Sequence, residues 1–215
     1  MQPDFIFIIA ILLMSVVIHE VSHGYVADML GDPTARLAGR LTLNPLKHLD
    51  PLGSIIIPAL LILSNAGFLI GWAKPVPYNP YNLSNQKWGE ALVAGAGPLV
   101  NIFIAIIFGI LIRFGIAFDF LTPAFIEIAG YVVFINILLA LFNMIPMPPL
   151  DGSKVLLSIL PYELAYKYNK LQEFVLRYGM IGGLLFLFAF IFFLWPFFSA
   201  FVSFLFTVIT GYSFF

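Results

Sequence analysis

The sequence has no cysteine and very little charge. Among its 215 residues there are 10 Lys or Arg and 11 Asp or Glu. Without cysteine, disulfide bonds, thiolate metal sites and cysteine nucleophiles are excluded. The net charge of −1 and the lack of a basic stripe argue against a nucleic-acid partner. The start of the chain also lacks the positive segment of a signal peptide, so we expect its first apolar run to remain in the mature protein.

What the chain has in excess is apolar surface. Hydrophobic residues make up 61% of it and the mean hydropathy is +1.02, whereas soluble domains are about 45–50% apolar. We therefore expect an all-α polytopic membrane protein in a lipid bilayer, with about four to six transmembrane helices. Four apolar stretches approach the length of a span: Phe5–Val26, Leu52–Ile70, Ala91–Phe114 and Ala124–Met144. A fifth, Met180–Ile209, is too long for one simple span. The last is interrupted at Trp195-Pro196, which predicts either one helix with a kinked continuation or a hairpin.

Between the first and third stretches the pattern changes. From Arg36 to Asn44, apolar and polar residues alternate, and a period of two predicts a short β-strand. The proline-rich segment from Gly71 to Asn82 predicts an irregular loop. No internal repeat is present, and no polar segment is long enough for an appended soluble domain. We expect a single membrane domain.

One motif in the first stretch carries chemistry. His19-Glu20-Val21-Ser22-His23 matches H-E-x-x-H, and on a helix residues i and i+4 share one face, so both imidazoles can reach one zinc ion. Glu20 lies beside them, placed to accept a proton from metal-bound water. The alternative is a polar patch near the lipid headgroups with no metal. Ionisable residues in a spanning helix are costly without partners, which favours the metal site.

Hydrolytic zinc usually has three protein ligands and one position left for water. The candidates for the third ligand are Asp151, His48, Asp50, Asp28 and Asp32. Asp28 and Asp32 follow too closely on the same helix or its end. Asp151 comes directly after a run with three prolines, which cannot continue a helix, and broken backbone near a bilayer is tolerated where it lines a cavity. We expect this extended segment to deliver the carboxylate; the alternative is that Asp151 merely caps the next helix.

Three motifs occur in a fixed order along the chain. They are His19-Glu20-x-x-His23, Gly97-Pro98-Leu99-Val100-Asn101 and Asn143-x-x-Pro146-x-x-Pro149-Leu150-Asp151-Gly152. Together they resemble the site-two protease family of intramembrane metalloproteases, over about Phe5 to Gly152. Two further segments, 40–45 and 71–77, resemble the compact branch of that family, which lacks PDZ and CBS domains.

The resemblance implies a protease that cuts within or beside a substrate's transmembrane helix, with one Zn²⁺ per chain. It implies His19, His23 and Asp151 as zinc ligands and Glu20 as general base. Asn143 would position substrate or stabilise the oxyanion, and Asn101 would line the site. His48 is either structural or a gating or alternative ligand. The domain would cover 1–215, with a catalytic core over about 5–152 and C-terminal helices over about 153–215.

A helical substrate must unwind before its peptide bonds can be attacked. The predicted strand, which contains Leu41, or the extended segment beginning at Pro146 could offer an edge for substrate to pair as a strand. Two other functions use the same residues: a metal transporter or storage protein, and a non-catalytic scaffold. Loss of function on Glu20→Gln separates the protease from the transporter. The oligomeric state cannot be inferred from the sequence.

The expected site also restricts the topology. H-E-x-x-H ends the first stretch and Asp151 follows the fourth, so a shared zinc ion requires these two helices to run in the same direction. One of the two stretches between them therefore cannot cross, and Leu52–Ile70, broken by prolines and glycines, is the one we expect to be re-entrant or to lie within the protein. Positive residues flank it and follow the fourth stretch, which places these loops and the active site near the cytoplasmic side of a prokaryotic plasma membrane. They are Arg36, Arg40, Lys47, Lys74, Lys87, Lys154, Lys167, Lys170 and Arg177.

Overall fold

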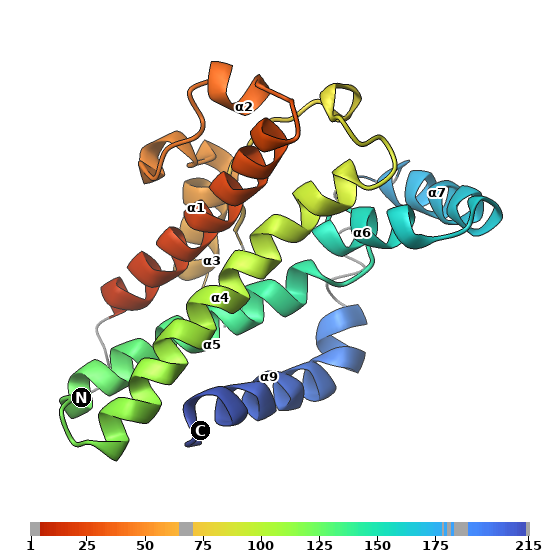
Figure 1. Cartoon of the computed structure of the whole chain (residues 1–215). Coiled ribbons are helices and arrows are strands. Elements are labelled where there is room, and N and C mark those ends of the chain that lie inside the picture. The colour runs from red at the N-terminus through yellow and green to blue at the C-terminus, as the bar shows by residue number, and fades with distance from the viewer. Residues whose placement is uncertain (1–4, 65–70, 178, 180–181, 183–188, 214–215) are drawn as a thin grey trace.

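The computed structural model describes residues 5–64, 71–177, 179, 182 and 189–213, and over these residues the chain is helical without any strand (Figure 1). The helices are α1 (Phe5–Met29), α2 (Thr34–Leu37), α3 (Ile57–Leu63), α4 (Gly89–Ala117), α5 (Pro123–Asn143), α6 (Asp151–Ile159), α7 (Tyr162–Arg177) and α9 (Trp195–Thr210). Short 3₁₀ turns lie at Pro45–Lys47 and Pro80–Asn82, and π-helical turns at Pro51–Ile56 and Phe190–Leu194.

Four of the described helical segments are long and apolar enough to cross a membrane: Ile6–Met29, Gly89–Ala117, Pro123–Asn143 and Phe192–Thr210. The prediction of an all-α integral membrane protein is confirmed, at the lower end of the expected number of spans. The break predicted at Trp195-Pro196 coincides with the start of α9, where Pro196 occupies the first turn. The preceding part of that stretch, residues 180–181 and 183–188, lies outside the described residues.

The stretch expected to be re-entrant is short in the structure. Its described part is the helical segment Pro51–Leu63, which at about 1.5 Å per residue is well short of the roughly 30 Å hydrocarbon core. Residues 65–70, at the end of the predicted stretch, lie outside the described residues.

Helix α4 is the centre of the bundle, and α1, α5, α6 and α9 all pack against it (Figure 1). A core of apolar residues fills the space between α4, α5 and α9, and includes Ala105, Ile112, Val133 and Phe206. Close approach depends on small residues: a Cβ atom at Gly109 would overlap the side chain of Ile209 on α9. The end of α1, the start of α4 and α6 gather at one end of the bundle (Figure 1).

The strand predicted over Arg36–Asn44 is wrong. Thr34–Leu37 form α2, and the rest of the segment is irregular. Alternation suggested a buried apolar face, but Leu37 is 80% and Leu43 is 55% exposed, whereas Arg40 is 8% exposed. Arg40 turns inward because its Nη2 atom donates a hydrogen bond to the carbonyl oxygen of Lys74, at 2.8 Å. In the described part of the chain no neighbouring strand is present to pair with this segment, so its backbone has no ladder to join.

Candidate metal centre

The two histidines of the H-E-x-x-H motif lie on one face of α1, as the helical period requires. Their rings are 4.7 Å apart between centroids and nearly perpendicular, at 88°. Both side chains are buried. Burial of two imidazoles in a membrane-spanning helix is favourable only if their nitrogen atoms have partners.

The third member of the site comes from the proline-rich loop between α5 and α6. Asp151 is the first residue of α6 and is buried. Its Oδ2 atom lies 3.1 Å from Nε2 of His19 and 3.3 Å from Nε2 of His23. One ligand atom from each of the three residues lies within 4.8 Å of the others. The structure thus brings together residues that are 132 positions apart in the sequence.

The other ring nitrogen of each histidine is engaged. Nδ1 of His23 lies 2.7 Å from the carbonyl oxygen of Val93, which can only accept, so the ring proton of His23 is on Nδ1. Nδ1 of His19 lies 3.1 Å from Oδ1 of Asn101 and donates to it in the same way. Both contacts come from α4. They leave the Nε2 lone pairs facing Asp151, which is how outer partners orient metal-binding histidines.

The carboxylate of Asp151 is in the form that binds metal. An aspartate carboxyl is ordinarily ionised at neutral pH, and the Oδ2 atom of Asp151 faces the Nε2 atoms of two buried imidazoles. Two imidazole lone pairs and an ionised carboxylate therefore converge on one point. Three electron-rich atoms at this spacing repel one another unless a cation lies between them.

The donor set fits zinc. Ligand atoms about 2.0–2.1 Å from a tetrahedral zinc ion lie about 3.3–3.4 Å from one another, and the two carboxylate–imidazole distances are 3.1 and 3.3 Å. Two His nitrogens and one carboxylate oxygen leave a fourth tetrahedral position for water. This is the composition of a hydrolytic zinc site and not of a structural one, which is closed by four protein ligands.

Gly97 is the point at which α4 passes closest to His19. A Cβ atom at Gly97 would lie 2.5 Å from Nε2 of His19, whereas a Cβ atom at Gly95 would meet nothing within 4 Å. The G-x-x-x-N element therefore has two roles on one helix: Gly97 makes room for the imidazole, and Asn101, one turn later, holds its Nδ1 proton.

Replacing Gly97 by Ala is expected to push the His19 ring off its position and weaken zinc binding, by about the 10- to 100-fold that disturbing an outer ligand contact costs. The measurement is zinc retained per chain in competition with a chromophoric chelator. Gly95→Ala is the matched control, because it makes the same exchange in the same helix into open space. Equal zinc affinity in both variants would contradict this role for Gly97.

The remaining candidates for the third ligand have other partners. Asp28 pairs with Arg36 at 3.3 Å, and Asp50 accepts a hydrogen bond from the Gly53 amide, at 2.7 Å. His48 is buried, and its Nε2 atom donates to the carbonyl oxygen of Thr42 at 2.8 Å, which holds a loop together. These three residues lie outside the cluster formed by His19, His23 and Asp151.

Asp32 is fully buried and links the end of α1 to the loop before α4 through hydrogen bonds. It accepts hydrogen bonds from Thr34, from the backbone of Asn79 and from the side chain of Asn82. Burial acts to raise the pKa of Asp32, but these hydrogen bonds outweigh it and lower that pKa. Its carboxylate is used for holding the loop and has no part in the metal cluster.

The predicted substrate-binding residues are placed unevenly. Asn101 contacts His19, as described. Asn143 is half-buried and donates to the carbonyl oxygen of Leu139 in its own helix, at 2.9 Å. Leu41 lies against α1 beside Gly24, and the carbonyl oxygen of Pro146 accepts a hydrogen bond from Tyr168 of α7, at 2.9 Å. Asn143 has no described contact with the three clustered residues.

Two contacts in the site were missed from the sequence. They are the Val93 carbonyl on His23 and the Val76 amide, which donates to Oε2 of Glu20 at 2.9 Å. Every residue type can supply the backbone carbonyl and every type except proline the amide, so residue type gives almost no signal for these contacts. For Val76 a weak signal exists, since it is the only residue with an N–H between Pro75 and Pro77.

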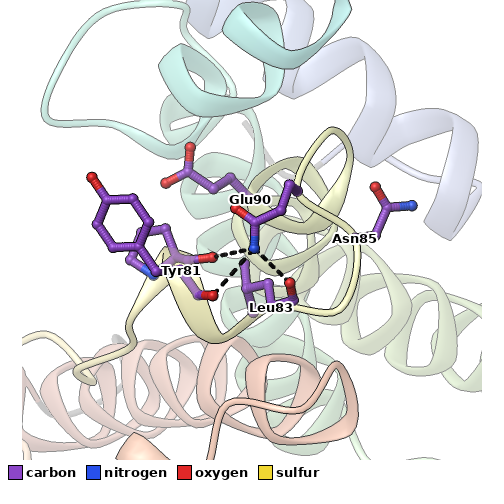
Figure 2. A pocket seen from close by; sticks show the side chains of 6 residues that line it. Tyr81, Leu83, Asn85 and Glu90 are labelled. Atoms are coloured by element: carbon purple, nitrogen blue, oxygen red, sulfur yellow. Dashed lines mark hydrogen bonds between the residues drawn. The ribbon is translucent and has the colours of Figure 1, made fainter.

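A separate hollow of about 260 Å³ lies in the loop before α4 (Figure 2). It is lined by Pro80, Tyr81, Leu83, Asn85, Gln86 and Glu90. Nε2 of Gln86 donates to the carbonyl oxygens of Pro80, Tyr81 and Leu83, at 3.3, 3.3 and 2.7 Å. None of the clustered histidines or Asp151 lines this hollow, which is a feature of the loop and lies apart from the metal centre.

Sequence relatives agree with the geometry. The profile of peptidase family M50 matches residues 115–190. A protein of Bacillus subtilis (strain 168) named "Putative zinc metalloprotease YwhC" is 33% identical over 204 residues, which cover 90% of this chain and 86% of that protein. The chain belongs to peptidase family M50. This is the site-two protease family that the three motifs resemble, so that prediction is confirmed.

More distant relatives of this M50 peptidase carry similar names. "Putative zinc metalloprotease Rip2" of Mycolicibacterium smegmatis is 33% identical over 152 residues, 69% of this chain and 55% of that protein. "Zinc metalloprotease MJ0392" of Methanocaldococcus jannaschii is 29% identical over 161 residues, 73% of this chain and 35% of that protein. The M50 peptidase thus spans only about half, or less, of these longer relatives. No solved structure matches it.

Proposed function

We propose that the chain is an intramembrane zinc metalloendopeptidase that hydrolyses peptide bonds within or next to transmembrane segments of membrane proteins. Its cofactor is Zn²⁺, one ion per chain, held by His19, His23 and Asp151. The observation that carries the proposal is the convergence of two imidazole Nε2 atoms on the Asp151 carboxylate, with each imidazole proton held on Nδ1. The naming of the relatives as zinc metalloproteases supports the same conclusion.

The protein groups have separate tasks in this chemistry. Zinc held by these ligands would supply a Lewis acid and would lower the pKa of an adjacent water molecule toward about 7. Glu20 would take a proton from the water that attacks the peptide carbonyl carbon, and would return it to the amine as the C–N bond breaks. Asn101 and the Val93 carbonyl keep the two imidazoles in the tautomer and orientation that the task needs.

We also propose which residues contact the substrate. We assign Asn143 to substrate positioning or to the oxyanion, and Asn101, Leu41 and Pro146 to the walls of the site. The support for Leu41 is its place beside Gly24 of α1, and the support for Pro146 is that it directly follows Ile145, whose carbonyl oxygen lies against Gly152 of α6. The whole chain, 1–215, would form one domain, with a catalytic core over about 5–152 and C-terminal helices over about 153–215.

A metal transporter or a non-catalytic scaffold would use the same ligands but would not need Glu20 as a base. The proposal is tested by incubating the purified protein in detergent with a single-span membrane substrate, for wild type and Glu20→Gln. Cleavage by wild type alone supports the peptidase. Zinc binding without cleavage by either protein would favour the alternatives.

We place the active site on the cytoplasmic side of a prokaryotic plasma membrane, because Lys and Arg concentrate at the end of the bundle that holds it. Since the chain has no cysteine, one introduced cysteine gives a unique label. Asn169→Cys on α7 is expected to react with an impermeant thiol reagent only after cells are opened. Phe120→Cys, between α4 and α5, is expected to react in intact cells. The reverse pattern would invert the orientation.

A further inference from the structure

An extended segment crosses α1 beside the metal centre. We call Trp72–Tyr78, which precedes α4 in the chain, the strap. Its backbone is fixed near its start by two hydrogen bonds: the Trp72 amide donates to the Gly53 carbonyl at 3.2 Å, and the Lys74 amide donates to the His48 carbonyl at 2.8 Å. The carbonyl oxygen of Lys74 also accepts from Arg40. The first part of the strap, before its contact with α1, is therefore held in place by these hydrogen bonds.

At Val76 the strap docks on α1 through both backbone and side chain. The Val76 amide donates to Oε2 of Glu20 at 2.9 Å. Val76 is 5% exposed, and its side chain packs against Gly24: a Cβ atom at Gly24 would lie 2.7 Å from Cγ1 of Val76. Glu20 and Gly24 are four residues apart and share one face of α1. One residue of the strap thus contacts the proposed base and the helix turn that follows it.

The local sequence explains why the Val76 amide points at Glu20. Proline has no amide hydrogen, so Val76 supplies the only donor between Pro75 and Pro77. A residue before proline is confined to extended backbone, which fixes the conformation of Lys74 and of Val76. In extended backbone, alternate residues direct their amides to the same edge. The amides of residues 72, 74 and 76 all lie on such an edge, and all three are used.

The far end of the strap reaches the helix that bears the third ligand. Nζ of Lys154 lies 5.1 Å from the ring centre of Tyr78, a cation–π contact. Lys154 is on the first turn of α6, three residues after Asp151. The strap therefore joins the two elements whose relative position defines the site: α1, with the base and two histidines, and α6, with the carboxylate.

We propose that Val76 is a positioning residue of the peptidase, acting through its backbone amide on Glu20. The amide holds one carboxylate oxygen, which restricts rotation of the side chain and leaves the second oxygen to accept a proton from water. This inference rests on the proposed function of Glu20 as general base. Orientation of a base contributes to rate only when the carboxylate is held in a narrow range of positions.

Val76→Pro tests the proposal because it removes the amide hydrogen and leaves the chain extended. Loss of a hydrogen bond to a charged group changes an equilibrium constant by about tenfold to a hundredfold. We therefore expect kcat to fall by about that factor, while KM and zinc content stay near wild type. Ala73→Pro is the matched control, since it adds a proline to the strap at an amide with no described partner. Val76→Ala keeps the amide and removes only the packing on Gly24, so its kcat is expected to exceed that of Val76→Pro.

A second measurement does not depend on activity. Because Pro75 and Pro77 have no amide hydrogen, the Pro75–Val76–Pro77 run exchanges exactly one, and fragment-resolved hydrogen exchange reports on Val76 alone. In metal-free protein this amide is expected to exchange slowly, and Glu20→Ala is expected to speed its exchange at least about tenfold. The control is the Lys74 amide, whose partner is His48 and whose exchange should be unchanged.

The outcomes separate this inference from the proposed function. If wild type cleaves and Val76→Pro matches it in kcat, the positioning role is overturned while the peptidase stands. A rise in kcat for Val76→Pro would also overturn it, because the strap would then restrain the base. If the exchange rate of the Val76 amide were the same in Glu20→Ala as in wild type, the hydrogen bond between Val76 and Glu20 would be shown not to form. A wild type that binds zinc without cleaving would overturn the proposed function, and the exchange result would still decide the contact.

Discussion

Replacing Glu20 by Gln is expected to lower kcat by about 100- to 10,000-fold and to leave about one zinc ion per chain. The first number is the usual contribution of a general acid or base, and zinc is retained because the three ligands are untouched. Gln keeps a side-chain oxygen that can accept the Val76 amide, so the strap is expected to stay in place. The measurements are cleavage of a single-span substrate and zinc content of the same preparation.

The control for this substitution is Glu90→Gln. Glu90 is in the first turn of α4, lines the separate hollow in the loop and lies outside the metal cluster (Figure 2). Its replacement removes the same charge near the same end of the bundle and is expected to leave kcat within about twofold of wild type, as for a surface substitution. If Glu20→Gln cleaved as fast as Glu90→Gln, the base would have to be another group.

Asp151→Ala is expected to abolish cleavage by removing a zinc ligand. The loss of zinc affinity should exceed the 10- to 100-fold that an outer partner costs, because one of three protein bonds to the ion disappears and two buried imidazoles lose the charge that faces them. Titration with a chromophoric chelator gives the affinity. The protein should still fold, since the rest of α6 and its packing against α4 are unchanged.

Asp50→Ala is the matched control, because Asp50 was also a candidate ligand but caps a helical turn at Gly53. It is expected to keep wild-type zinc affinity. Undiminished zinc in Asp151→Ala would mean that the third ligand is elsewhere, and Asp151→Ala combined with His48→Ala would then show whether His48 supplies it.

The sequence was informative where side-chain chemistry and helical period act together. The spacing of His19 and His23 predicted their common face, and the run of prolines before Asp151 predicted an interrupted helix. It misled at Arg36–Asn44, because alternation indicates a strand only if a partner strand exists and if the apolar face is buried. Here Leu37 and Leu43 face outward and Arg40 faces inward.

Other features could not be read from residue types. Val93 and Val76 act through backbone atoms, and their placement depends on how α4 and the strap pack on α1. Asn143 illustrates the opposite case: the motif gives it a role, whereas its side chain is bonded within its own helix. Its catalytic role remains a prediction that depends on substrate.

The distance in sequence between the ligands has a consequence for folding. Under the proposed ligand set, one ion ties positions 19 and 151 together, which are 132 residues apart, and so closes a loop containing more than half of the chain. An ion that binds the folded form and not the unfolded one shifts the folding equilibrium by mass action. Maturation of the protein in the bilayer is then linked to the free zinc concentration of the compartment that α6 faces, and the zinc-bound form is expected to be more stable than the metal-free form.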